Sequence, residues 1–357
     1  MKGYWYNKMN KFQIVEVTEQ LNHAGTKATA DISVIADKMG FNRVNIKMDT
    51  TVKSAIGKIE RQLGYFRDWK KAEKLITKGS ILLLQHPFHY PQLTRERTLK
   101  SIKKKGVKII SIVHDVEELR AFRFNDYYKH EFEVMVELAD VIIVHNDVMK
   151  SWFVSRGQDS NKLISLEIFD YLQEEQQTKQ VEFERSIIVA GNLDTTKCGY
   201  IGKLGEIENI KVHLYGPNFN EDLRKAENIE YHGSFPVDEI PSKLNSGFGL
   251  VWDGESIDGC RGESGQYLKI NNPHKLSLYL SSGIPVIIWK AAAEAKYVEE
   301  NGVGITVDSL RELSVILNSL SSERYQELVE NVKAKQSLIQ TGYYARTAID
   351  SALGILK

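Results

Sequence analysis

Short apolar, β-branched runs alternate with amphipathic stretches along the first half of the chain. The runs span residues 12–17, 44–46, 80–84, 108–113 and 141–144. The stretches between them carry apolar residues at helical spacing. Strands that are buried on both faces read as continuous apolar runs, so this alternation predicts a parallel sheet covered by helices on both sides.

The same alternation restarts in the second half, at residues 186–190, 211–215, 229–231, 249–252 and 285–288. We therefore expect an α/β protein with two doubly wound, Rossmann-like domains. The carboxyl ends of two such sheets can face each other across a cleft, and open α/β sheets bind ligands at those ends. The active site is expected to draw on both halves.

A change of composition separates the two halves. Residues 171–180 are dominated by Gln and Glu, which is typical of a linker between domains. The first domain is therefore placed at residues 1–172 and the second at 173–340. Residues 341–357 form a C-terminal segment, whose helix is expected at 347–356 and is expected to pack back on the first domain.

Charge and cysteine content exclude some classes of protein. Lys plus Arg and Asp plus Glu number 47 each, and the sequence pI is about 7.1. This balance argues against a nucleic-acid-binding protein that works by neutralising phosphates. Cys198 and Cys260 are too few for a disulfide framework and match no zinc motif, so we interpret both as free thiols.

Hydropathy gives an expectation about location. No apolar run reaches the length of a membrane span, and the N-terminus lacks the apolar region of a signal peptide, so we expect a cytoplasmic protein. The lysine-rich segment 100–108 leaves open a peripheral contact with anionic lipid at the inner face of the cell membrane. A solvated helix face is the favoured interpretation of that segment.

One strand, loop and helix in the second half carry a candidate binding site. Asp253 follows the strand at 249–252, while Asn272, His274 and Lys275 precede a helix expected at 276–282. A helix N-terminus favours negative charge, because its N–H groups lack partners and its dipole is positive there. A lysine at that end opposes the dipole and needs an anion, which favours binding over a solvated lysine. The pattern indicates a nucleotide-sugar site.

A second candidate site follows a strand of the first half. His114 and Asp115 come directly after the run that ends at residue 113, so they lie at the carboxyl end of a strand. A hydroxyl that acts as a nucleophile needs a base that removes its proton. Asp115 is the first candidate base and His114 the second. The alternative is that Asp115 caps a helix beginning at residue 116.

These motifs resemble those of the GT-B glycosyltransferases. Within that fold, the chain is similar to the glucosyltransferase 3-like enzymes and to the bacterial beta-1,6-galactofuranosyltransferases. The resemblance is carried by residues 22–28, by His114-Asp115 with Leu119-Arg120, and by the segment 247–285. It runs along nearly the whole chain.

The resemblance implies further site residues on both sides of the cleft. The glycine-containing loop with His23, Gly25 and Thr26 would border the acceptor, although an ordinary turn is the alternative. Asn192, together with Lys197, would face the diphosphate of the donor. An exposed lysine is the default for any loop, so this role for Lys197 competes with simple solvation.

Two more residues complete the donor side. The ring of Tyr215 could stack on uracil or belong to the core. Many retaining GT-B enzymes carry a glutamate pair where this chain has Leu278 and Tyr279, and Glu294 is expected to replace the missing ribose contact. The missing pair favours inversion over retention.

Together these features predict an enzyme that moves a hexosyl group, galactofuranose or glucose, from a UDP-sugar to a sugar hydroxyl of a glycan or lipid-linked oligosaccharide. No metal or other cofactor is expected, because the chain has no Asp-x-Asp pair and the helix start with its lysine can stabilise the leaving diphosphate. A UDP-sugar epimerase and a non-catalytic partner of another transferase remain alternatives. Homo-oligomer formation is left open.

Overall fold

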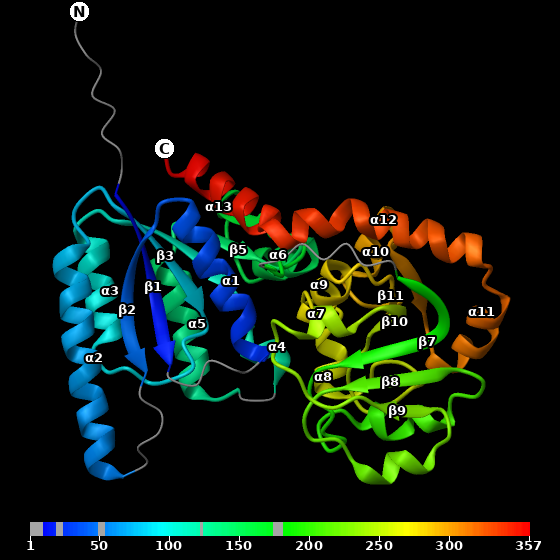
Figure 1. Ribbon diagram of the computed structural model, residues 1–357. Coiled ribbons are helices and arrows are strands. Elements are labelled where there is room, and N and C mark those ends of the chain that lie inside the picture. Colours follow the sequence, from blue (N-terminus) through cyan, green and yellow to red (C-terminus); the bar gives the residue numbers. More distant parts are fainter. Residues whose placement is uncertain (1–9, 19–23, 49–53, 122–123, 174–180) are drawn as a thin grey trace, which may run out of the picture.

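The computed structural model describes residues 10–18, 24–48, 54–121, 124–173 and 181–357. Within these ranges the chain forms two lobes, each built around one six-stranded sheet, with a pair of long helices running over both lobes (Figure 1). Every strand pair in both sheets is parallel. The predicted GT-B arrangement of two doubly wound domains is confirmed.

The first sheet has the strand order β2-β1-β3-β4-β5-β6. Its strands are β1 (Lys11–Thr18), β2 (Asn42–Met48), β3 (Ile81–His86), β4 (Lys108–Val113), β5 (Val141–Val144) and β6 (Leu163–Ser165). The central strands β3, β4 and β5 are almost entirely buried, as expected for strands covered by helices on both faces. The order reverses between β1 and β3.

The second sheet has the strand order β12-β11-β10-β7-β8-β9. Its strands are β7 (Glu182–Ala190), β8 (Lys211–Tyr215), β9 (Ile229–Tyr231), β10 (Ser246–Val251), β11 (Val286–Trp289) and β12 (Gly304–Val307). The order reverses between β7 and β10, which is the point where such sheets bind ligands. Sequence reasoning missed β12, a short edge strand.

Helices cover both faces of each sheet. In the first lobe they are α1 (Ala24–Lys38), α2 (Ala55–Leu75), α3 (Arg95–Lys104), α4 (Glu117–Arg120), α5 (Asp126–Leu138) and α6 (Asp147–Ser155). The others are α7 (Ile240–Lys243), α8 (Gly262–Tyr267), α9 (His274–Ser281), α10 (Ala295–Asn301), α11 (Leu313–Ser319), α12 (Ser322–Thr341) and α13 (Tyr343–Ile355). Within the described ranges, no helix is both long enough and apolar enough to cross a bilayer.

The last two helices connect the lobes. α12 packs on α9 and β7 of the second lobe, whereas α13 packs on α1, β5 and β6 of the first (Figure 1). Gly342 joins them with φ +82°, and a Cβ atom there would lie 2.6 Å from the side chain of Ile35 on α1. Glycine is therefore required at this bend on two grounds, the left-handed backbone and the close approach of α1.

The first residues of the predicted linker belong to the folded interface rather than to a polar connection. Tyr171 is buried, its ring stacks on His274, and its hydroxyl donates to the carbonyl of Val237 at 2.7 Å. The ammonium of Lys27 lies 5.0 Å from the same ring and donates to the carbonyl of Leu172. Tyr171 therefore belongs to the buried domain interface although its neighbours are polar, because one aromatic ring outweighs the polar composition around it.

Candidate active site

The carboxyl ends of β7 and β10 meet at the reversal of the second sheet. β7 leads into Gly191 and Asn192, and β10 is followed by Trp252 and Asp253. Gly216, after the adjacent strand β8, has φ +148°, and a Cβ atom there would lie 1.7 Å from the carbonyl oxygen of Gly191. The backbones of residues 191 and 216 approach so closely that residue 216 must be glycine. No side chain at residue 216 therefore covers the ends of β7 and β8.

Lys275 is the second residue of α9, which begins two residues earlier than the sequence indicated. Its ammonium donates to the carbonyl oxygen of Trp252 at 3.1 Å. Burial disfavours the charged ammonium, but the carboxylate of Asp253 together with nearby thiol and phenol groups more than offsets this effect, and the pKa of Lys275 is raised. A fixed positive charge therefore stands at the carboxyl end of β10, beside a helix N-terminus.

The loop after β7 lies against the same place. The thiol of Cys198 donates to Asp253 Oδ1 at 3.6 Å, and burial raises the pKa of this thiol to about 11. Asn192 is exposed, and its side-chain oxygen accepts hydrogen bonds from the Asp194 backbone and the Asn218 amide. Nothing in the sequence around Cys198 indicated that its thiol would contact this site.

Lys197 lies on the same loop but its contacts do not single it out. Its side chain is exposed, and the nearest carboxylate, that of Asp194, is 3.6 Å away. Both observations fit an ordinary surface lysine as well as a ligand-binding lysine in the unliganded protein. Its contact with a diphosphate stays a prediction.

Tyr215 is a core residue rather than an open stacking platform. The ring is buried and stacks on His232, with 4.5 Å between centroids and 9° between planes. His232 in turn lies 3.0 Å from His213 Nδ1, within hydrogen-bonding distance. The face on which a base was expected to stack is already covered by an imidazole.

The same histidines form the one group among the described residues that could hold a metal ion. One ligand atom each from His213, Glu230 and His232 lies within 4.8 Å of the others. The group lies on β8 and at the end of β9, and Glu184 contacts the far nitrogen of His213 at 3.1 Å. Hydrogen bonds already link the two rings to each other and to Glu184, which accounts for the arrangement without an ion.

Asn272 joins the two domains instead of facing a ligand. It is buried, and its side-chain NH₂ donates to the carbonyls of His145 and Glu167 at 2.7 and 2.8 Å. Its oxygen accepts from Asn146 at 2.7 Å, and its backbone N–H donates to His145 Nδ1. These contacts correct the prediction of a donor-binding Asn272, because both amide hydrogens are used within the protein.

His274 and Glu294 are also enclosed at the domain interface. His274 packs between Tyr171 and Phe169, and burial lowers its pKa to about 4. Glu294 is 2% exposed and accepts from Asn146 at 3.2 Å, and burial raises its pKa to about 8. Glu294 is therefore buried against the first domain rather than open to a donor. His274 is half-buried, and its contact with a donor stays a prediction.

His114 lies at the end of β4, as predicted, and its tautomer follows from its partners. The amide nitrogen of Gln85 donates to the carbonyl of Thr29, so the amide oxygen of Gln85 accepts from His114 Nε2–H at 2.7 Å. The ring stacks on Phe169 with 8° between planes. Burial lowers the pKa of His114 to about 3, which makes its remaining nitrogen a weak proton acceptor.

Asp115 is held by charged and polar partners from both domains. Arg120 donates to its carboxylate at 2.9 Å, and Tyr267 of α8 forms a hydrogen bond with the same carboxylate. The hydroxyl of Tyr267 also accepts from the backbone N–H of Val116 at 3.1 Å. Val116, not Asp115, occupies the N-cap position of α4, so the capping alternative is wrong. Sequence reasoning gave Tyr267 no role.

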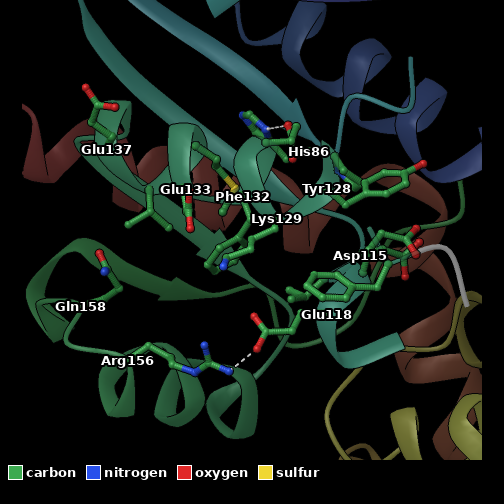
Figure 2. Close-up of a pocket in the computed structure, with 17 residues that line it drawn as sticks. His86, Asp115, Glu118, Tyr128, Lys129, Phe132, Glu133, Glu137, Arg156 and Gln158 are labelled. Carbon is green, nitrogen blue, oxygen red and sulfur yellow. Dashed lines mark hydrogen bonds and ion pairs between the residues drawn. The ribbon is translucent and has the colours of Figure 1, made fainter. Parts of the chain in front are cut away.

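A cavity of about 670 Å³ lies beside Asp115 (Figure 2). Its walls come from the end of β3, from α4 and α5, and from the end of α6, all in the first domain. Phe124, Tyr128 and Phe132 supply aromatic surface, while Lys129 and an Arg156–Glu118 ion pair supply charge. The cavity therefore offers apolar surface and hydrogen-bonding groups within reach of a carboxylate.

The acceptor-side loop predicted around His23 is mostly helix. Gly25 and Thr26 belong to the first turn of α1, which begins five residues earlier than expected, and His23 lies outside the described residues. The carbonyl of Thr26 accepts from the hydroxyl of Thr29 at 2.9 Å. This turn still stands at the carboxyl end of β1, the edge at which β4 presents Asp115.

One cationic residue near Asp253 escaped the sequence analysis. Arg261 is exposed and occupies the N-cap position of α8. Its carbonyl oxygen would lie 2.0 Å from a Cβ atom on Gly254, which has φ +95°, so the loop folds back directly onto the residue after Asp253. The available signal was the density of glycines in residues 254–265, which is typical of backbone that approaches a ligand or another chain segment closely.

Comparisons with known proteins place the chain in a family. Residues 11–168 match the N-terminal domain of the glucosyltransferase 3-like family, and residues 187–352 match its C-terminal domain. The beta-1,6-galactofuranosyltransferase WbbI of Escherichia coli is 35% identical over 255 residues, which cover 70% of this chain and 72% of that protein. Glucosyltransferase 3 of Streptococcus gordonii is 25% identical over 331 residues, covering 92% and 94%.

Solved structures share the fold. A glycosyltransferase from Rickettsia africae superposes with a TM-score of 0.61 at 13% identity, covering 98% of this chain and 99% of that one. Anabaena HepE, solved with UDP and glucose, gives a TM-score of 0.59 at 10% identity, covering 97% and 99%. The chain therefore belongs to the glucosyltransferase 3-like family, and it is a glycosyltransferase with the GT-B fold.

Proposed function

We propose that this enzyme transfers a hexosyl group from a UDP-sugar to a hydroxyl of another sugar during assembly of a surface polysaccharide or glycan. Galactofuranose is the favoured hexose and glucose the second. The observation that carries the proposal is the ammonium of Lys275, fixed beside Asp253 at the carboxyl end of β10 and at the N-terminus of α9. That is the place where a doubly wound sheet binds a phosphorylated ligand.

The donor half of the reaction needs a stabilised leaving group. As the bond from the anomeric carbon to UDP breaks, negative charge develops on the diphosphate. Lys275 carries three N–H donors, and the hydrogen bonds found among the described residues use one of them, on Trp252. The N–H groups that begin α9 add positive potential at the same edge. No metal ion is needed in this arrangement.

The acceptor half needs a base and a place for the incoming sugar. Asp115 borders the cavity of the first domain, and that cavity combines aromatic rings with charged groups, a lining that suits a sugar. The acceptor oxygen attacks the anomeric carbon while its proton passes to Asp115. Attack from the face opposite UDP inverts the configuration. Arg120 and Tyr267 would orient the carboxylate for this step.

The choice of sugar rests on the relatives. The 35% identical relative carries the name of a galactofuranosyltransferase, whereas the two relatives named glucosyltransferase 3 are 25% and 22% identical. Galactofuranose therefore stands first. A lipid-linked oligosaccharide at the cytoplasmic face of a membrane is the acceptor class that fits such an enzyme.

A panel of UDP-hexoses, including UDP-galactofuranose, tests the proposal. Each donor would be incubated with the full chain and a glycan or lipid-linked acceptor, and UDP release would be followed. UDP release from one donor, dependent on acceptor, is the expected result. A new sugar nucleotide formed from the donor alone would identify an epimerase instead, and no turnover with any donor and acceptor would favour a non-catalytic role.

A further inference from the structure

Large apolar side chains are exposed along the outward face of α2. Ile56, Ile59 and Leu63 are 71%, 62% and 55% exposed, and Phe66 follows on the same side. Their spacing of three or four residues aligns them on one face of the helix. The opposite face, with Tyr65, Trp69 and Ala72, is buried in the core of the first domain. The apolar face is therefore a surface feature and not a misplaced part of the core.

A neighbouring loop extends this surface. Leu93, in the connection between β3 and α3, is 80% exposed. Gln62 of α2 fixes that connection, because its side chain donates to the carbonyl of Pro91 at 2.9 Å and accepts from the N–H of Leu93 at 3.1 Å. We call Ile56, Ile59, Leu63, Phe66 and Leu93 the α2 patch. Contiguous apolar surface of this kind marks an interaction site.

The α2 patch lies at the edge of the first sheet that carries the catalytic groups. α2 follows β2 and the Leu93 loop follows β3, so both connections start from the carboxyl ends of parallel strands. β4 presents His114 and Asp115 at that same edge. In Figure 1 the first turns of α2 extend beyond the rest of this lobe, on the side to which β1 and β2 point.

Basic residues continue the patch along the helix. The second half of α2 carries Arg67, Lys70, Lys71 and Lys74, all exposed. Lys70 pairs with Glu73, whereas within the described ranges no ion pair joins Lys71 or Lys74 to a carboxylate. An apolar face next to a row of cations is the pattern of helices that lie in the interface of an anionic membrane.

The lysine-rich segment 100–108 is different. Lys100 pairs with Glu96 and Glu137, and Lys103 and Lys108 both pair with Asp140. Carboxylates of the protein therefore pair with three of the five lysines in this segment, and Lys105 donates to the backbone carbonyls of Glu73 and Ile76. These contacts favour the solvated-face interpretation. The row of cations that continues an apolar face lies on α2.

We propose that the α2 patch and the adjacent lysines dock the first domain on an anionic bilayer. The apolar side chains would enter the boundary between headgroups and acyl chains, and the lysines would contact lipid phosphates. Docked in this way, with α2 lying along the membrane, the enzyme would hold the carboxyl edge of its first sheet beside the bilayer surface. This role of the α2 patch rests on the proposed function, because docking on a membrane brings the enzyme to an acceptor sugar that is carried on a lipid.

A second copy of the chain is the other candidate occupant of the patch. A twofold contact would place the same surface on both subunits, so the basic half of α2 would meet either the same cations or the apolar half of the other copy. Neither arrangement complements the cations, whereas an anionic bilayer complements both parts of the surface. The charge pattern therefore favours the membrane.

Flotation of the purified full chain with lipid vesicles tests the proposal. One set of vesicles contains phosphatidylglycerol and phosphatidylethanolamine, and the other contains phosphatidylcholine alone. The double variant Ile59→Ser/Leu63→Ser removes apolar surface, and Lys71→Glu/Lys74→Glu reverses charge. Val315→Ser, on α11 of the second domain and 75% exposed, is the matched control for losing an exposed apolar side chain.

The unaltered chain and Val315→Ser should float with the anionic vesicles. The affinity of each double variant for these vesicles should be lower by a factor of about ten or more. The phosphatidylcholine vesicles should recover less protein. All substituted residues are exposed, so melting temperatures should agree. The proposal is overturned if the unaltered chain does not bind anionic vesicles, or if the double variants bind as well as the control. A mass that halves on Ile59→Ser/Leu63→Ser, measured by light scattering, would assign the patch to a second copy instead.

Vesicle binding is measured without UDP-sugar, so the two proposals can fail separately. Binding to anionic vesicles without UDP release from any donor would contradict the proposed function alone. UDP release without vesicle binding would contradict the docking surface alone.

Discussion

Replacing Lys275 by methionine tests the donor site, and its effects on binding and on folding can be separated. Methionine keeps most of the side-chain length but removes the ammonium that donates to Trp252 and faces Asp253. A hydrogen bond between a charged group and a phosphate contributes about 1.5–3 kcal/mol. UDP should therefore bind roughly 10- to 150-fold more weakly.

The same substitution should also lower the free energy of unfolding, whereas substitution of a fully exposed lysine would leave it nearly unchanged. It leaves the carbonyl of Trp252 without its partner and the carboxylate of Asp253 without its neighbouring cation, for a loss of about 1–3 kcal/mol. A second change, Asp253→Asn, removes the uncompensated charge. The double variant Lys275→Met/Asp253→Asn should regain part of the lost melting temperature and none of the lost UDP affinity.

Calorimetric titration with UDP and scanning calorimetry on the same preparations give both quantities. Unchanged UDP affinity in Lys275→Met would remove the lysine from the donor site. Recovery of UDP affinity in the double variant would refute the reasoning in another way. It would mean that the lysine acts by neutralising Asp253 and not by contacting phosphate.

Three further outcomes are expected. Asp115→Asn should lower kcat by roughly 10²–10⁴-fold while UDP affinity stays the same, because the base acts on the acceptor; near-normal kcat would send the search for the base to His114. Transfer should survive saturating chelator, measured as UDP release; loss of activity that manganese or magnesium restores would contradict metal independence and direct attention to the cluster around His213. Buried Glu294 should keep its proton up to about pH 8, whereas the unfolded chain loses it near pH 4.5, so this residue lowers stability as the pH rises between those values. Glu294→Gln cannot lose a proton, and its advantage in melting temperature over the parent should grow from pH 5 to pH 8; a constant difference would show that Glu294 titrates normally.

The fold could be predicted because buried parallel strands leave a strong local signal. β4, β5, β8 and β9 occupy the residues at which their apolar runs predicted them. β12 was missed because an edge strand of four residues, half of them glycine or threonine, has too little apolar character to stand out. Tyr171 shows the opposite error, since a Gln- and Glu-rich neighbourhood hid a residue that the domain interface buries.

The candidate site could be predicted only as far as topology determines it. Asp115, Asp253 and Lys275 follow strand ends or begin a helix, and a doubly wound sheet brings such positions to one edge. Asn272 and Glu294 are equally close in sequence to that edge, but they point into the other domain. No local pattern distinguishes the two directions, because the partners that decide them are more than a hundred residues away.

The return of α13 to the first sheet has a consequence for engineering this enzyme. A chimaera that exchanges specificity between relatives is usually made by joining one N-terminal half to another C-terminal half at a single point. Here such a junction near residue 173 would pair a foreign α13 with α1, β5 and β6, including the fit of Gly342 against Ile35. The structural unit formed by the first sheet and the helix that covers it is therefore discontinuous in sequence, and an exchange of this domain needs a second junction at Gly342, so that the last helix is exchanged together with the sheet.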